Sequence, residues 1–146
     1  MKPHDLEIAL KPIINSTAAA WVMAVGWSIF TVVMMLSPGS QTAASDLSAA
    51  AGGTEWTDYL GHVALTLTET VLLANLLMRY MPLRPALIWS AVPVLIITSV
   101  LEFMQRWVPD RGSSVFDAAA NAVGIAIGVW LAQKLEARRH EEPLAK

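Results

Sequence analysis

Four long apolar stretches alternate with short polar segments in this chain, and the basic residues lie almost entirely on one side of them. An apolar run of about 20 residues spans the hydrocarbon of a bilayer, and short loops rich in Lys and Arg stay in the cytoplasm. Eight of the ten Lys and Arg residues flank the stretches on a common side, namely Lys2, Lys11, Arg79, Arg84, Lys134, Arg138, Arg139 and Lys146. The pattern predicts an all-α bundle of four transmembrane helices with both termini in the cytoplasm.

Composition excludes several functional classes. The 146 residues are 55% hydrophobic with a mean hydropathy of +0.49, which indicates one membrane domain. The basic residues are spread over several flanks instead of forming one patch, so we expect no nucleic-acid partner. The chain has no cysteine, which rules out disulfides, thiolate metal sites and a cysteine nucleophile.

Turn-forming and capping residues divide the chain. The apolar stretches predict helices over about 12–36, 57–78, 86–107 and 115–135, with a cytoplasmic N-terminus (1–11), an outer loop (37–56) and a cytoplasmic tail (136–146). Pro93 falls inside the third helix, where a kink is expected. The first stretch is longer than the 7 to 15 apolar residues of a secretory signal, which favours a retained anchor over cleavage near Ser45.

Polar residues inside these helices form one row on each of three helices. At about 100° per residue, Asp58, His62 and Glu69 share a face of the second helix. The other two rows are Glu102 with Gln105 on the third helix, and Asp117 with Asn121 on the fourth. Most of them lie within about two turns of the predicted outer interface. We therefore expect them to converge beneath the outer surface, with Arg106, Asp110 and Arg111 at the rim.

Small residues follow the polar row of the fourth helix. Ala120, Gly124 and Gly128 form a ladder that would allow close packing against a neighbouring helix.

The polar residues also give the chain its family resemblance. Asp58 and His62, the Glu102-Phe103-Met104-Gln105 segment, Arg111, and the Asp117 to Asn121 pair leading into glycines follow the order found in the VanZ-like family of small bacterial membrane proteins. The chain resembles that family over about residues 57–130. It departs from the pattern at Tyr59, where the family usually has Lys, and at Thr66, where it usually has Tyr.

The resemblance implies a multi-pass protein of the bacterial cytoplasmic membrane, with an accessory or binding role in low-level teicoplanin resistance or in envelope glycan and lipid metabolism. Expected partners are the bilayer and a lipid-linked glycan, a lipid head group or a glycopeptide. The ligand-binding residues expected from the rows and the resemblance are Asp58, His62, Glu102, Gln105, Arg111, Asp117 and Asn121.

Two other functional classes remain open, and a proton or ion carrier is a further, less favoured one, because Asp58, His62 and Glu69 descend one helix face but only Asn75 continues that row toward the cytoplasm. In an enzyme, His62 would act with Glu102 or Asp117 as acid and base on an envelope lipid. In a structural subunit of a homo- or hetero-oligomer, the small-residue face of the fourth helix would be the docking surface. His62 is the only histidine expected within the bundle, so we expect no metal site and no cofactor.

Each candidate also has a purely structural interpretation. Asp117 fits a capping box that begins at Ser114, and Asp58 suits the first turn of a helix. His62, Gln105 and Asn121 fit interhelical hydrogen bonds. Glu69 lies deeper, outside the positions that resemble the family, and must be protonated, paired across helices or hydrated.

Overall fold

The computed structural model describes residues 16–38, 46, 49–50, 52–53, 55–112 and 114–141. Within these residues the chain forms four long helices, α2 (Thr17–Leu36), α4 (Glu55–Leu77), α5 (Leu83–Met104) and α6 (Val115–Glu141), with a short 3₁₀ helix, η1 (Gln105–Trp107), after α5. Each long helix has the length and apolar composition needed to cross a membrane. The prediction of an all-α four-helix bundle is confirmed.

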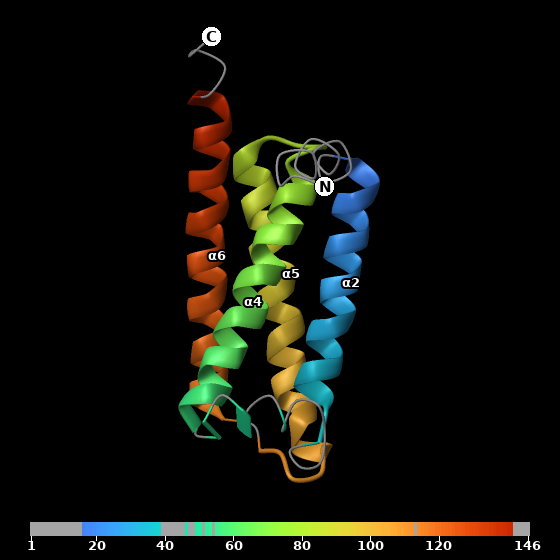
Figure 1. Ribbon diagram of the computed structural model, residues 1–146, viewed down its shortest axis with the longest axis vertical. Helices are drawn as coiled ribbons and strands as arrows, with labels where there is room; N and C mark the ends of the chain where they lie inside the picture. Colours follow the sequence, from blue (N-terminus) through green and yellow to red (C-terminus); the bar gives the residue numbers. More distant parts are fainter. Residues whose placement is uncertain are drawn as a thin grey trace, which may run out of the picture.

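The helices run up and down side by side, so the start of α2 and the end of α6 lie at the same end of the bundle (Figure 1). The α4–α5 turn, with Arg79 and Arg84, also lies there, whereas η1 and the start of α6 lie at the other end. We call these the basic end and the acidic end, because the second carries Asp58, Asp110 and Asp117.

Local sequence explains where the helices begin. Ser16 caps α2, and its hydroxyl accepts a hydrogen bond from the Ala19 amide at 3.0 Å. Ser114 accepts from the Phe116 amide at 3.1 Å, ahead of α6. The third helix begins at Leu83, three residues before its predicted start, because Pro85 is tolerated in a first turn, where its missing N–H has no helical partner.

The remaining boundaries differ modestly from the predicted ones. Helix α5 continues through Pro93 as one element, and its predicted last turn is the tighter η1. Helix α6 extends to Glu141, six residues beyond the predicted end, and rises past the other helices (Figure 1). The predicted residues 12–15 and most of the outer loop lie outside the described residues.

Small side chains fill the centre and large apolar ones face outward. Buried contacts join Ala20, Ala24 and Leu76, and a second set joins Ala74, Leu87 and Ala132. Many large apolar residues are exposed, including Val22, Ile29, Ile96, Trp107 and Phe116. A soluble bundle buries such side chains, whereas a membrane bundle packs through small residues and turns the large ones toward lipid. The distribution supports a multi-pass membrane protein.

Thiol labelling can determine which end faces outward. Because the natural chain has no cysteine, single cysteines in place of Ser45, Arg84 and Gly112 can be treated on intact cells with a membrane-impermeant thiol reagent. We expect labelling at 45 and 112 and protection at 84, since Lys and Arg favour the cytoplasmic side. The reverse pattern would place the acidic end in the cytoplasm. Arg84 and Gly112 are exposed, and Ser45 lies outside the described residues.

Candidate functional site

Near the acidic end, three helices bring their polar rows together. His62 comes from α4, Glu102 from α5, and Asp117 and Asn121 from α6. All four residues are at most 8% exposed. We call them the polar cluster. Their convergence within the bundle is the arrangement that the rows predicted.

Asn121 contacts both Glu102 and His62. Its Nδ2 donates to Glu102 Oε1 at 2.9 Å, and its Oδ1 lies 3.1 Å from His62 Nδ1. His62 Nδ1 also lies 3.2 Å from Glu102 Oε1. Both neighbours of Nδ1 are acceptors, so the hydrogen-bond network assigns a proton to Nδ1. Glu102 thus fixes the orientation of the imidazole ring.

The second imidazole nitrogen faces a second carboxyl group. His62 Nε2 lies 3.9 Å from Asp117 Oδ1, too far for a direct hydrogen bond. The Asp117 side chain is 12% exposed and the His62 side chain 4%. Asp117 therefore stands between the imidazole and the surface. Asp117 lies in the first turn of α6, where it could act as a cap, but it also lies beside the His62 ring.

Thr66, on α4, packs against the backbone of two members of the cluster. Its hydroxyl lies 2.8 Å from the His62 carbonyl and 3.1 Å from the Asn121 carbonyl, and the residue is fully buried. The sequence marked Thr66 only as a departure from the family pattern. Its spacing of one turn from His62 is the signal that could have placed it here.

Gln105 and Arg111 fasten the end of α2. Gln105 Nε2 donates to the Met35 carbonyl at 2.9 Å. Arg111 donates to the Met34 and Ser37 carbonyls, both at 3.2 Å. The last carbonyls of a helix lack helical partners and attract cations. Gln105 and Arg111 were both expected to bind ligand. Instead, they donate hydrogen bonds to carbonyl groups at the end of α2 and hold that helix beside the cluster.

Two buried oxygens beside these contacts have no hydrogen-bond partner among the described residues, namely Glu102 Oε2 and Gln105 Oε1. Both groups are acceptors, because the Gln105 amide nitrogen already faces α2. An unsatisfied buried acceptor costs about 1 to 3 kcal/mol. Each of these two oxygens can therefore accept a hydrogen bond.

The other predicted residues lie around the cluster. Asp58 is exposed and lies one turn before His62 on α4. Arg106 lies over the Phe103 ring at 5.0 Å, and Asp110 adopts a positive φ of 56° in the turn before α6. Among the described residues no group of three or more His, Cys, Asp or Glu side chains is arranged to hold a metal ion.

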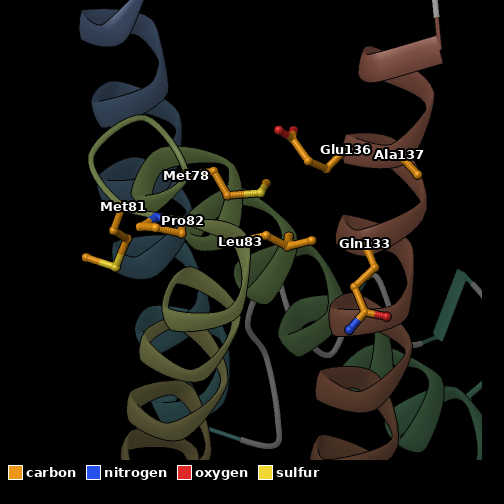
Figure 2. A pocket seen from close by; sticks show the side chains of 7 residues that line it. All are labelled: Met78, Met81, Pro82, Leu83, Gln133, Glu136 and Ala137. Atoms are coloured by element: carbon orange, nitrogen blue, oxygen red, sulfur yellow. The ribbon is translucent and has the colours of Figure 1, made fainter.

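A cavity that the sequence did not predict lies at the basic end. It measures about 290 Å³ and opens between the α4–α5 turn and α6. Figure 2 shows Met78 and Leu83 on one side and Gln133 and Glu136 on the other. It is thus separated from the polar cluster by the length of the bundle.

No protein-family model matches this chain, and neither the curated proteins nor the solved structures provide a match.

Proposed function

We propose that the protein is a VanZ-like integral membrane protein of the bacterial cell envelope whose polar cluster binds a donor-rich head group at the outer face. The observation that supports this proposal most directly is the surroundings of the Glu102 carboxyl group. One oxygen of this group is satisfied by Asn121 and His62, while the other is buried without a partner among the described residues. Hydroxyl and amine groups of a lipid-linked glycan or glycopeptide supply the missing donors.

The depth of the cluster suits this role. The cluster lies toward one end of the spans formed by α4, α5 and α6 and not at their centre, so a head group at the interface reaches it without crossing the hydrocarbon. Asp117, the most exposed member, marks the side of entry. The proposed role is accessory, in teicoplanin-type resistance or in envelope glycan and lipid metabolism.

Isosteric variants test the proposal. We expect the wild-type chain to give teicoplanin tolerance to a susceptible bacterial host. We expect Glu102→Gln and His62→Gln to accumulate and to melt cooperatively in detergent, yet to remove that tolerance. Glu136→Gln, at the basic end, is the matched control and should keep the tolerance. If neither cluster variant accumulates, the cluster is only a scaffold; if both keep the tolerance, it has no role in binding.

An enzyme is the second candidate, because a carboxyl group orients the imidazole through Nδ1 and leaves Nε2 to take up a proton. In that case purified protein would cleave or transfer an envelope lipid, with turnover lost in His62→Gln while the lipid still binds. Incubation with extracted envelope lipids, followed by mass spectrometry of the products, distinguishes the two roles. If the protein binds the lipid without catalysing a reaction, the lipid masses stay unchanged.

A further inference from the structure

Glu69 is a buried carboxyl group near the middle of the bundle, away from the polar cluster. It lies on α4, facing α2, and is 6% exposed. Within residues 17–36 of α2, 63–77 of α4, 85–101 of α5 and 118–133 of α6, Glu69 is the only ionisable residue. No cationic side chain is therefore available at its depth on any helix. An unpaired carboxylate in such surroundings is strongly disfavoured.

The hydrogen bonds around Ser28 indicate where a proton lies. Ser28 Oγ lies 2.9 Å from the Ala24 carbonyl and 2.5 Å from Glu69 Oε1. A hydroxyl group has one hydrogen, and serine in a helix commonly donates it to the carbonyl four residues earlier. The carbonyl of Ala24 cannot donate. The second short contact is then satisfied when Glu69 carries a hydrogen and donates it to Ser28.

A second hydroxyl borders the same group. Thr31, one turn along α2 from Ser28, is 4% exposed, and its hydroxyl lies close enough to the Glu69 carboxyl group to interact with it. The contact is too loose for a hydrogen bond of good geometry, and Glu69 Oε2 accepts none from the described residues. Glu69, Ser28 and Thr31 thus bring together one carboxyl group and two neutral hydroxyls, a set that offers hydrogen bonds to a carboxylic acid but no charge to a carboxylate.

We propose that Glu69, with Ser28 and Thr31, is a proton-binding site inside the membrane, and that it holds its proton at neutral pH. Loss of the proton would leave a negative charge between α2 and α4 and loosen their contact. This site is independent of the head-group role proposed for the polar cluster, since it involves different residues and a different helix pair.

Carbodiimide labelling tests the proposal directly. Dicyclohexylcarbodiimide is an apolar reagent that reacts with protonated carboxyl groups: the carboxyl oxygen bonds to the carbodiimide carbon, the proton moves to a nitrogen, and the adduct rearranges to a stable N-acylurea. In purified full-length protein we expect the adduct on Glu69 at neutral pH and less of it as the pH rises. Glu69→Gln should lose the adduct. If Na⁺ suppresses labelling where choline does not, a metal cation occupies the site and the proton assignment is wrong.

Thermal melting as a function of pH provides a second measurement that does not depend on reagent access. On the proposal, the folded bundle holds the Glu69 proton at neutral pH, so raising the pH removes that proton and favours unfolding. We expect the Tm of the wild type to fall more than that of Glu69→Gln between neutral pH and about pH 9. Glu136→Gln serves as the control and should behave as wild type. If the Tm falls equally with pH in the wild type and in Glu69→Gln, and no carbodiimide adduct forms on Glu69, the proposal is wrong.

Discussion

Asn121→Asp is expected to destabilise the folded bundle by about 3 to 5 kcal/mol, the cost of leaving a charge uncompensated in a buried network. The side chain keeps its size but loses the Nδ2 donor that lies 2.9 Å from Glu102 Oε1. A carboxylate oxygen would then face a carboxylate oxygen at hydrogen-bond distance. Asp117 is already near the same imidazole, so one His62 would have to compensate three acidic groups.

Thermal melting in detergent and the amount of protein that reaches the membrane are the measurements. Asn75→Asp is the matched control, because Asn75 Oδ1 accepts a hydrogen bond from Arg139 at 2.8 Å near the basic end. A new carboxylate there faces a cation, so the Tm should stay the same or rise slightly. Equal behaviour of the two variants would mean that the polar cluster is hydrated and tolerates charge.

The sequence predicted the membrane bundle well because each step depended on local rules. Span length and the distribution of basic residues identify transmembrane helices whatever their partners are. The faces that carry His62, Glu102 and Asn121 follow from helical periodicity alone. Their convergence was a reasonable expectation, since polar groups in a membrane helix turn toward protein.

The hydrogen-bond partners of several predicted residues depend on tertiary contacts and could not be predicted from the sequence. Gln105 was expected on the inner face of the third helix and Arg111 at the rim of the cluster, but both donate to carbonyls of α2 that are at least 70 residues away in the chain. Nothing in the spacing of these two residues indicates that the end of α2 comes within reach. The Ser28 contact of Glu69 was equally hidden, because it depends on how α2 is rotated against α4. Sequence periodicity fixes the face of a residue, whereas the partner depends on the packing of whole helices.

The close approach of α6 to α4 leads to the second large effect, in Gly124→Ala and Gly128→Ala. A Cβ atom at Gly124 would lie 2.5 Å from the Val63 carbonyl oxygen and closer still to the Thr66 hydroxyl. At Gly128 it would lie 2.8 Å from Thr70 Cβ and 2.9 Å from the Leu67 carbonyl oxygen. Overpacking of this kind typically costs about 1 to 3 kcal/mol, and backbone atoms cannot move aside as a flexible side chain would.

Two other helical glycines serve as controls. A Cβ atom at Gly26 or Gly61 meets nothing within 4 Å, so alanine there should stabilise the helix by up to about 1 kcal/mol. We therefore expect the Tm in detergent to fall for Gly124→Ala and Gly128→Ala and to rise slightly for Gly26→Ala and Gly61→Ala. A rise in all four variants would show that α6 does not pack against α4 at this distance.

The clash at Gly124 also bears on the polar cluster, because Asn121 precedes it by three residues, less than one turn of α6. Any shift of α6 away from α4 lengthens the 3.1 Å contact between Asn121 and His62. Adding Thr66→Ala to Gly124→Ala removes the hydroxyl clash but leaves the Val63 carbonyl in place, so the Tm should recover only in part. If the proposed head-group role is right, the teicoplanin tolerance should remain impaired in the double variant, since the small residue at position 124 sets the spacing between the imidazole and the amide that contacts Glu102.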